Sequence, residues 1–389
     1  MVDYADLSAI RGFGKNEKPL RVAIIGCGMI ANSAHFPALN ELRKEGLVEV
    51  VAVADIRPEA AYSTAKRHNV PLVYLDPQRM LEEVRPEFVA VCTPNVYHKE
   101  WTVRALRVGA HVACEKPMAL TLRDAKEIWQ TAKECRRMVF PCQCMRWRNY
   151  MMRSRELVES GELGDVYFSD VSFIRRIGVP TWGMFHMKEH NFGGPFCDLG
   201  VHLIDSLLWV VGGRRVEAVS GSAYTKIANR GEEVLLSLAE SGAYSGAFDP
   251  RPYDHKEFNV EEFSTGFMRL SGGMGVNFKF SWAINLPTTN LDMVICGDRG
   301  GLSVNGEKLY KNVGRFQAES EMKWFDNGAY KGVPFEQHRY MYRNILGTLA
   351  EEEEYLIREE ENLEVTRAIE CFYRSAEEGR EIRASELLG

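Results

Sequence analysis

The sequence predicts an α/β protein. Its first part reads as a doubly wound parallel sheet, and its second part as an α+β region with a large, open, mostly antiparallel sheet. Between residues 21 and 146, short apolar runs alternate with helical patterns in the rhythm of βαβ units. After residue 150, longer alternating strands separated by glycine turns dominate. The chain has 389 residues, more than the roughly 250–300 at which a single core stops growing. We therefore expect an N-terminal extension over residues 1–20, a first domain over 21–146 and a second domain over 147–389.

The expected strands of the first domain are short, apolar or β-branched, and nearly continuous in hydrophobicity, as parallel strands buried on both faces should be. They are Arg21–Gly26, Val48–Ala54, Phe88–Cys92, His111–Cys114 and Met138–Cys142. The stretches between them predict helices over Ile30–Lys44, Pro58–His68, Val96–Val108 and Leu122–Cys135. Thr121, with Asp124 three residues later, is typical of the N-cap of the last helix.

The second domain is expected to begin with a helix over Tyr150–Ser160, which ends at Gly161. One apolar helix follows over Asp198–Val211, and the tail, Glu336–Leu388, returns to helix. The expected strands of this domain are Val166–Arg176, Val216–Tyr224, Val260–Leu270, Gly275–Trp282 and Leu291–Cys296. Glycine-bearing turns favour antiparallel hairpins with one open face, and they occur over Ser271–Gly275 and Gly297–Gly301.

Composition and charge exclude several classes of protein. Apolar residues make up 45% of the chain and charged residues 26%, ordinary values for a globular protein. The net charge of −6 gives no electrostatic footprint for nucleic acid or an anionic membrane. No apolar run approaches the ~20 residues that span a bilayer, and residues 1–19 contain no apolar signal region. Cys142 and Cys144 lack C-x-x-C spacing, and we expect reduced thiols and a cytoplasmic protein.

A glycine motif follows the first expected strand and opens the first helix: Gly26-x-Gly28-x-x-Ala31, with Met29 and Ile30 at its turn. In this context the first glycine permits a tight turn and the second lets the backbone approach a pyrophosphate, which the helix N-terminus then binds. Asp55 ends the second strand, near the spacing of ~20 residues expected for a carboxylate on the ribose hydroxyls. The first domain is therefore expected to be an NAD(P)-binding Rossmann domain.

Asp55 favours NAD, because a carboxylate repels the 2′-phosphate of NADP, whereas the nearby Arg57 is of the type that accommodates that phosphate. We expect NAD, with NADP as the alternative. The segment Thr93-Pro94-Asn95 leaves the third expected strand at its carboxyl end, where open sheets bind ligands, and His98 follows one helical step on.

Two further groups carry candidate catalytic chemistry. Glu115-Lys116-Pro117 follows the fourth expected strand at the same ligand-binding edge. Asp198 and His202 are spaced i, i+4 and so share one face of a helix. Oxidation of an alcohol requires a proton acceptor. Histidine can accept the proton at its ordinary pKa, and lysine can do so where burial or a nearby positive charge lowers its pKa. The alternative for the pair is an N-capping Asp and a core His.

Together these motifs resemble the glucose–fructose oxidoreductase/inositol dehydrogenase (Gfo/Idh/MocA) family. The matching segments are Gly26-x-Gly28-x-x-Ala31, Thr93-Pro94, Glu115-Lys116-Pro117 and Asp198-x-x-x-His202-x-x-Asp205, with weaker echoes in Val260–Phe263, Ser281–Ala283 and Gly297–Gly301. The resemblance implies a catalytic group of Lys116, Asp198 and His202, and a homo-oligomer formed through the open sheet. The chain departs from the family pattern at Gly193-Gly194-Pro195 and at Gln143–Arg146, beside the expected pocket, so the substrate of any one relative does not transfer directly.

The motifs and the family resemblance together predict two sets of contact residues, one for the cofactor and one for the substrate. The cofactor set is Gly26, Gly28, Met29, Ile30, Asp55, Arg57, Thr93, Pro94, Asn95, His98, Glu115, Lys116 and Arg146. The substrate set is Lys116, Trp182, Lys188, Asp198 and His202.

A second motif is expected to be a decoy. His186-Met-Lys-Glu189-His190 has the H-x-x-E-H order of an inverted zinc-peptidase motif. That chemistry needs both histidines on one helix face and a third ligand, but Gly193-Gly194-Pro195 ends any helix almost at once. We expect no metal site, and instead a loop over the substrate pocket in which Lys188 or His186 binds sugar hydroxyls.

The function expected from these features is NAD-dependent oxidation of a secondary ring hydroxyl of a sugar, glycoside or cyclitol, most specifically at C3. Two alternatives stay open. Some relatives of this family are NAD-dependent redox glycosidases, which release an aglycone with no net NADH. The second alternative is a non-catalytic, cofactor-binding regulator with the same fold. The presence of Lys116, Asp198 and His202 counts against it, because such a protein should have lost the catalytic residues.

Overall fold

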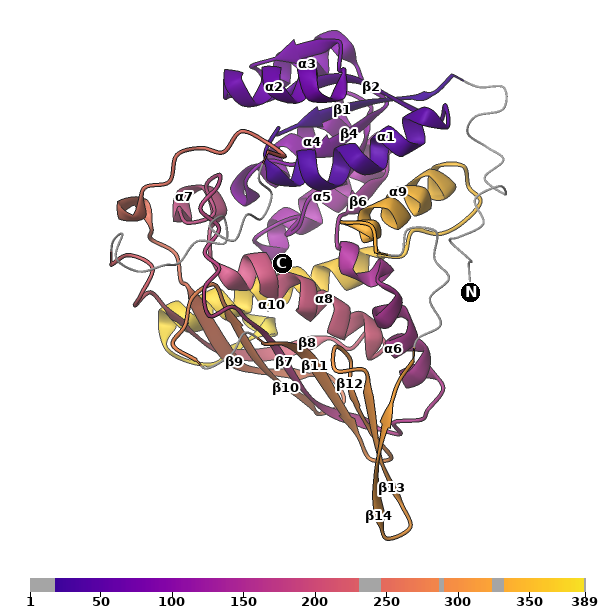
Figure 1. Cartoon of the computed structure of the whole chain (residues 1–389), viewed down its shortest axis with the longest axis vertical. Helices are drawn as coiled ribbons and strands as arrows, with labels where there is room; N and C mark the ends of the chain where they lie inside the picture. The colour runs from indigo at the N-terminus through magenta and orange to yellow at the C-terminus, as the bar shows by residue number, and fades with distance from the viewer. Residues whose placement is uncertain (1–17, 231–245, 287–289, 324–331, 388–389) are drawn as a thin grey trace.

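The computed structural model describes residues 18–230, 246–286, 290–323 and 332–387 (Figure 1). Residues 1–17 of the expected N-terminal extension lie outside the described residues, as does Leu388 at the end of the expected helical tail. The chain forms a six-stranded parallel sheet and a nine-stranded, mostly antiparallel sheet, which confirms the predicted fold class. Within the described residues, no helix has the length and apolar character that a membrane crossing needs.

The six-stranded sheet has the strand order β3-β2-β1-β4-β5-β6, and all of its pairings are parallel. Its strands are β1 (Leu20–Ile25), β2 (Val48–Ala54), β3 (Leu72–Tyr74), β4 (Phe88–Val91), β5 (His111–Cys114) and β6 (Val139–Pro141). The strand order reverses between β1 and β4, and such sheets bind ligands outside the carboxyl ends of their strands at this point. Only β3 is missing from the expected strands, because three partly exposed residues at a sheet edge carry little hydrophobic pattern.

The helices packed on this sheet agree with the expected segments except at two places. They are α1 (Phe36–Lys44), α2 (Pro58–His68), α3 (Pro77–Val84), α4 (His98–Arg107) and α5 (Leu122–Cys135), with short 3₁₀ segments η3 (Asn95–Tyr97) and η4 (Cys144–Trp147). The helix expected over Ile30–Lys44 is divided, because the π-helical segment η2 (Ala31–His35) precedes α1. The unexpected α3 begins with Asp76 as N-cap and Pro77 at its first position, a recognised start signal.

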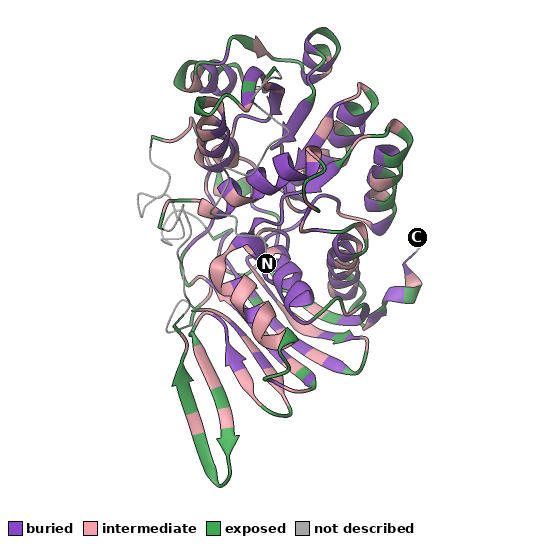
Figure 2. Cartoon of the chain, turned by 90° about the vertical axis from the view of Figure 1, so that its right-hand side faces the viewer, coloured by how far each residue is buried: buried purple, intermediate pink, exposed green. Residues whose placement is uncertain are grey.

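The nine-stranded sheet has the order β14-β13-β12-β11-β7-β10-β9-β8-β15, in which only β7 and β10 pair in parallel. Its strands are β7 (Val166–Ile174), β8 (Val216–Tyr224), β9 (Phe263–Leu270), β10 (Met274–Ser281), β11 (Asn290–Gly297), β12 (Gly301–Ser303), β13 (Lys308–Val313), β14 (Phe316–Glu321) and β15 (Ile382–Arg383). Both expected glycine turns join antiparallel neighbours, β9 to β10 and β11 to β12. The hairpin of β13 and β14, which is largely exposed, projects from the molecule (Figure 2).

The remaining helices belong to the part of the chain that follows β6. They are α6 (Asn149–Glu159), α7 (Lys188–Asn191), α8 (Val201–Val210), α9 (Glu336–Leu349) and α10 (Glu359–Glu378), with η5 (Phe196–Gly200), η7 (His255–Glu257) and η8 (Ala384–Glu386). Helices α8 and α10 lie on one face of the nine-stranded sheet, between it and the first sheet (Figure 1). Helix α9 instead packs on the first sheet, where its Met341 and Ile345 share a buried cluster with Leu39 of α1. The last part of the chain therefore holds both halves together.

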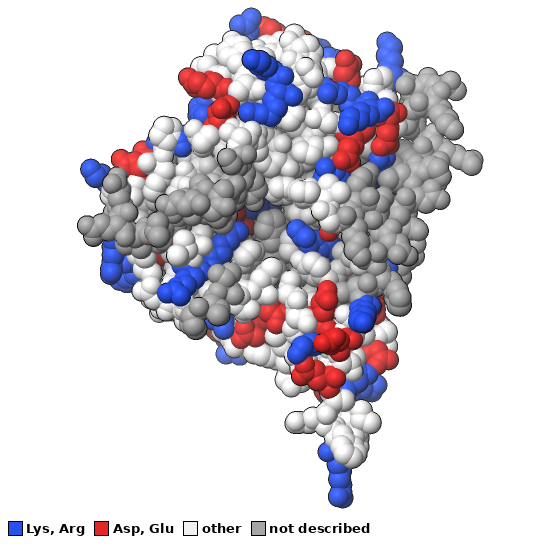
Figure 3. Space-filling model, in the orientation of Figure 1, with Lys and Arg blue, Asp and Glu red and all other residues white. Residues whose placement is uncertain are grey.

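The surface carries no patch of a single charge on the face drawn in Figure 3. There, Lys and Arg side chains are interspersed with Asp and Glu side chains over both sheets (Figure 3). This mixed pattern agrees with the net charge of −6 and lacks the basic stripe that a nucleic-acid-binding face presents.

Candidate active site

The glycine motif forms the turn between β1 and η2. At the first position of this turn only glycine fits. Gly26 has φ +95°, and a Cβ there would lie 2.5 Å from the carbonyl oxygen of Cys92. A Cβ on Gly28 would meet nothing within 4 Å, so the backbone is open to a ligand on that side. Gly28, Met29 and Ile30 are partly exposed at the start of the helix, where the first N–H groups lack intrahelical acceptors. This is the geometry that a pyrophosphate requires.

We expect Gly26→Ala to weaken NAD binding at least tenfold. The added Cβ collides with the backbone after β4, and the positive φ adds about 1–2 kcal/mol of strain for any L-residue. Isothermal titration with NAD measures the affinity. Gly46→Ala is the matched control, because Gly46 also has a positive φ (+78°) but its Cβ would meet nothing within 4 Å. Equal affinities of the two variants for NAD would contradict the role of the Gly26 turn.

Asp55, at the end of β2, faces this turn. Its two carboxylate oxygens accept hydrogen bonds from the backbone N–H groups of Cys27 and Arg57, both at 2.8 Å. Each oxygen has a further lone pair, and the residue is partly exposed, so the carboxylate can also accept ribose hydroxyls. The guanidinium of Arg57 donates instead to the carbonyl of Asp249, at 2.9 Å.

Lys116 and Asp198 form an ion pair where the first sheet meets the second part of the chain. Lys116 Nζ donates to Asp198 Oδ1 at 3.0 Å and to the Asp198 carbonyl at 2.9 Å. The other carboxylate oxygen, Oδ2, accepts a 3.0 Å hydrogen bond from Nε1 of Trp282, which is fully buried. Lys116 and Asp198 side chains are only 12% and 15% exposed. The pair is therefore rigidly held but reachable from solvent.

Ionic contacts rather than burial decide the charge state of this pair. Burial alone would lower the pKa of Lys116, but the carboxylates of Asp198 and Glu115 outweigh it and raise that pKa. Burial would likewise raise the pKa of Asp198, but Lys116 and Arg175 lower it. Sequence reasoning required a depressed pKa for Lys116 to act as a base, and the structure shows the opposite direction. Lys116 is therefore a hydrogen-bond donor and a positive charge.

His202, one turn beyond Asp198, is held in its neutral form. Burial, and next the positive charge of Lys116, lower the pKa of His202 to about 3, so its imidazole is neutral near pH 7. Its Nδ1 has no hydrogen-bond partner among the described residues. Asp198 lies in the π-helical η5 and His202 in α8, so the expected continuous α-helix is divided here too. Such π-bulges are frequent at functional sites.

A buried carboxylate that the sequence did not identify holds the loop before Asp198 in place. Glu261 accepts hydrogen bonds from the N–H of Gly194 (2.9 Å) and from the hydroxyl of Tyr373 (2.8 Å). A Cβ on Gly193 would overlap the Tyr373 ring, and one on Gly194 would overlap the Glu261 carbonyl. The two glycines are therefore needed for close packing, and Glu261 positions η5 and its Asp198.

Comparisons with known proteins agree with this site. Residues 20–142 match the oxidoreductase family with an NAD-binding Rossmann fold, and residues 151–303 match the Gfo/Idh/MocA C-terminal domain. The chain is 34% identical over 296 residues to D-glucoside 3-dehydrogenase of Escherichia coli (strain K12), a match covering 75% of this chain and 79% of that protein. The chain belongs to the Gfo/Idh/MocA family. It is therefore an NAD(P)-dependent oxidoreductase.

Two further relatives extend the comparison. Glucose-6-phosphate 3-dehydrogenase of Bacillus subtilis (strain 168) is 31% identical over 194 residues, which are 49% of this chain and 53% of that protein. The crystal structure of an oxidoreductase domain protein from Kribbella flavida superimposes with a TM-score of 0.77 and covers 95% of this chain and 100% of its own. At 18% identity this similarity shows the shared fold alone.

Residues of this Gfo/Idh/MocA protein fit the dinucleotide that the family binds. The open side of Gly28 and the carboxylate of Asp55 lie at the carboxyl ends of β1 and β2. After β4, the hydroxyl oxygen of Thr93 is buried and lacks a hydrogen-bond partner among the described residues, so it is available to a ligand. Pro94 beside it is partly exposed. Asn95 is buried, and its amide donates to the carbonyl of Asn191, so it holds the loop rather than facing the cleft.

Three residues expected at the cofactor have other positions in the structure. His98 is 1% exposed, and its ring nitrogens lie 2.7 Å from the Pro117 carbonyl and 2.8 Å from the Thr93 carbonyl, so neither is left for a ligand. Glu115 is buried and faces His35 instead. Arg146 is fully buried and pairs with two carboxylates from α8 and α10. Their positions in the motifs are near the cleft, but their side chains point into the interior.

The loop before η5 contains the expected substrate residues and the decoy motif. Trp182 is 5% exposed, whereas Lys188 is exposed at the start of α7. The two histidines of the H-x-x-E-H motif have separate partners, since His186 Nε2 lies 3.4 Å from Glu257 and His190 Nδ1 lies 2.9 Å from the Tyr97 hydroxyl. Helix α7 ends at Asn191, as the glycines predict. The motif therefore does not assemble a zinc-peptidase site.

Proposed function

We propose that this protein oxidises a secondary ring hydroxyl of a glucoside or related sugar to a ketone, at C3, with NAD as hydride acceptor. The observation that carries this proposal is the Lys116–Asp198 ion pair with a neutral His202 near it, at the carboxyl end of β5 in the same parallel sheet whose β1 ends in the glycine turn. The choice of C3 is supported by two relatives, which are named as 3-dehydrogenases of a D-glucoside and of glucose 6-phosphate.

Each residue has one part in this mechanism. The neutral imidazole of His202 takes the proton of the reacting hydroxyl. The Lys116 ammonium donates a hydrogen bond to the same oxygen and stabilises the negative charge that develops on it. Asp198 holds the ammonium in place, and the indole N–H of Trp282 in turn fixes the Asp198 carboxylate. NAD, when bound, supplies the carbon that accepts the hydride.

NAD rather than NADP is part of the proposal. The Asp55 carboxylate faces the position where the adenosine ribose of a dinucleotide lies in such folds, and a 2′-phosphate would meet its charge there. Arg57, the residue that would accommodate that phosphate, already donates to the Asp249 carbonyl. Oligomerisation through the nine-stranded sheet and a cytoplasmic location belong to the same proposal.

The pH dependence of turnover should identify His202 as the proton acceptor. Only the neutral imidazole accepts a proton, and a pKa lowered to about 3 keeps it neutral down to that pH. We therefore expect the acidic limb of kcat/KM to lie well below pH 6.5, the usual value for histidine. A pH–rate profile measured between pH 4 and 9 checks this. A limb near 6.5 would show that the acceptor is another group or that the site does not perturb His202.

The function itself is tested with the purified protein, NAD, and a panel of free sugars, O- and C-glycosides and inositols. We expect NADH absorbance together with a product that has lost two hydrogens, and fragmentation of that product shows whether C3 carries the ketone. Release of an aglycone without NADH accumulation would replace the proposal with the redox glycosidase. Binding of NAD with no change in any sugar would overturn it in favour of a cofactor-binding regulator.

A further inference from the structure

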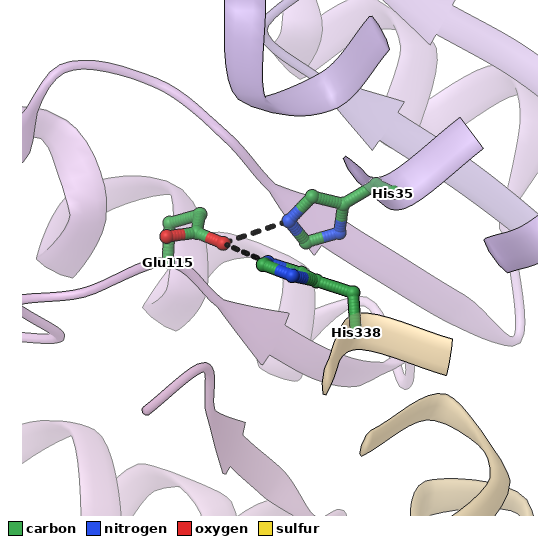
Figure 4. Close-up of side chains that lie close together, drawn as sticks. All are labelled: His35, Glu115 and His338. Carbon is green, nitrogen blue, oxygen red and sulfur yellow. Dashed lines mark hydrogen bonds and ion pairs between the residues drawn. The ribbon is translucent and has the colours of Figure 1, made fainter. Parts of the chain in front are cut away.

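Two histidines and a glutamate form a buried cluster (Figure 4). His35 comes from η2, Glu115 from the end of β5 and His338 from α9, and their side chains point toward one another. The three residues are 0%, 4% and 2% exposed. One nitrogen or oxygen of each lies within 4.8 Å of the other two. The mechanism above uses none of these side chains.

We propose that His35, Glu115 and His338 bind a Zn²⁺ ion that fastens the dinucleotide turn, the Lys116 loop and α9 together. Glu115 Oε1 lies 2.8 Å from His35 Nε2 and 3.5 Å from His338 Nε2. Ligand atoms of a tetrahedral zinc site, with bonds of 2.0–2.2 Å, lie about 3.4 Å apart. The two distances lie on either side of this value, so small side-chain shifts suffice to coordinate an ion.

The groups around the cluster are those that orient metal ligands. His35 Nδ1 lies 2.7 Å from the hydroxyl of Tyr342, so Nε2 is directed at the centre of the cluster. Glu115 Oε2 accepts the backbone N–H of Lys116 at 3.1 Å, which leaves Oε1 for the ion. Metal-binding imidazoles and carboxylates are characteristically fixed through their second nitrogen or oxygen in this way.

Hydrogen bonding alone leaves the cluster incomplete. Neither ring nitrogen of His338 has a hydrogen-bond partner among the described residues, although the side chain is buried. An unsatisfied buried polar group costs about 1–3 kcal/mol. The nearest polar contact of His338 is a long one, from Nε2 to Glu115 Oε1 at 3.5 Å, and Glu115 Oε1 already lies 2.8 Å from His35 Nε2. A metal ion would bind one atom of each of the three side chains, including Nε2 of His338.

The charges around Glu115 point the same way. Buried carboxylates are paired with a cation or coordinate a metal. The neighbouring ammonium of Lys116 donates its hydrogen bonds to Asp198. Two imidazoles and one carboxylate form a ligand set that zinc prefers over magnesium or calcium. The sequence shows no metal motif because the three ligands are far apart in the chain.

The experiment measures metal binding directly, without NAD or sugar, so its outcome is independent of the proposed dehydrogenase activity. The full chain is stripped with a chelator, dialysed, reconstituted with Zn²⁺ or Co²⁺ and analysed by mass spectrometry of its metal content. We expect one ion per chain, the visible absorption bands of tetrahedral Co²⁺, and a higher melting temperature with Zn²⁺. His338→Gln and Glu115→Gln should lose the ion, while the matched control His255→Gln, at a partly exposed histidine outside the cluster, should keep it.

Absence of stoichiometric metal in the reconstituted wild-type protein would overturn the proposal, whatever the variants do. Retention of the ion by both His338→Gln and Glu115→Gln would also overturn it, because the metal would then lie elsewhere. Circular dichroism of each variant separates loss of the ion from loss of the fold.

Discussion

Lys116→Met should lower kcat by about 10²–10⁴-fold, the range associated with loss of a positioned proton-transfer or charge-stabilising group. The Lys116 ammonium is partly reachable from solvent and lies close enough to His202 for its charge to lower the pKa of that histidine. Methionine keeps the aliphatic length but removes the charge, so the oxygen of the substrate loses its stabilising donor in the transition state. NAD affinity should change little, because the dinucleotide contacts assigned to Gly28 and Asp55 do not involve this ammonium. Single-turnover hydride transfer and NAD titration measure the two effects separately.

The matched control is Lys99→Met in α4, where the ammonium pairs with Glu127 on the surface. That variant should keep wild-type turnover and NAD affinity. Turnover of Lys116→Met within tenfold of the wild type would contradict the assignment of Lys116 to the reaction. A parallel loss of NAD affinity would show that Lys116 holds the cofactor rather than the reacting hydroxyl.

Helices and strands with a clear hydrophobic periodicity and recognisable capping residues could be predicted from the sequence. Val48–Ala54, Pro58–His68, Leu122–Cys135 and Val216–Tyr224 have in the structure the bounds that their sequence patterns predict. Among the described residues, five strands were not predicted: β3, β12, β13, β14 and β15. Strands β3 and β15 are short and lie at sheet edges, β12 has three residues, and β13 and β14 form a largely exposed hairpin, so few apolar residues mark any of them. The two π-helical segments leave no sequence signal, because the extra residue per turn is imposed by tertiary contacts.

The candidate site was predictable where one short motif determines both the backbone conformation and the functional side chains. It was not predictable where the site depends on contacts between residues that are distant in the sequence. The glycine turn and the proximity of Lys116 to Asp198 follow from strand ends that meet at one edge of a sheet. The hydrogen bond from Trp282 and the support from Glu261 join residues more than 60 positions apart in the chain. The direction of the Lys116 pKa depends on both carboxylates beside it, and their positions are a property of the folded chain.

Arg146→Met should destabilise the protein by about 3–5 kcal/mol, the cost of breaking a buried ion pair from one side. The guanidinium is fully buried, donates through Nε and Nη2 to Asp205 at 2.9 and 2.6 Å, and also pairs with Glu361. Its removal leaves Asp205 in the interior without the cation that it pairs with, while Glu361 keeps its second partner, Arg358. Urea unfolding followed by circular dichroism measures the change.

Two further variants separate the buried charge from a general effect of losing an arginine. Arg79→Met removes an exposed i, i+4 pair with Glu83 and should cost no more than about 1 kcal/mol. Replacement of Arg146 by Met together with Asp205→Leu and Glu361→Leu should recover much of the lost stability, since a buried ionic triad exchanged for apolar side chains is often neutral or stabilising. The triad joins η4, α8 and α10, and α8 is the helix that carries His202. If the triple variant recovers stability but not turnover, the triad contributes to function by holding α8 in position. If Arg146→Met costs no more than Arg79→Met, these charges do not stabilise the contact of η4 with α8 and α10.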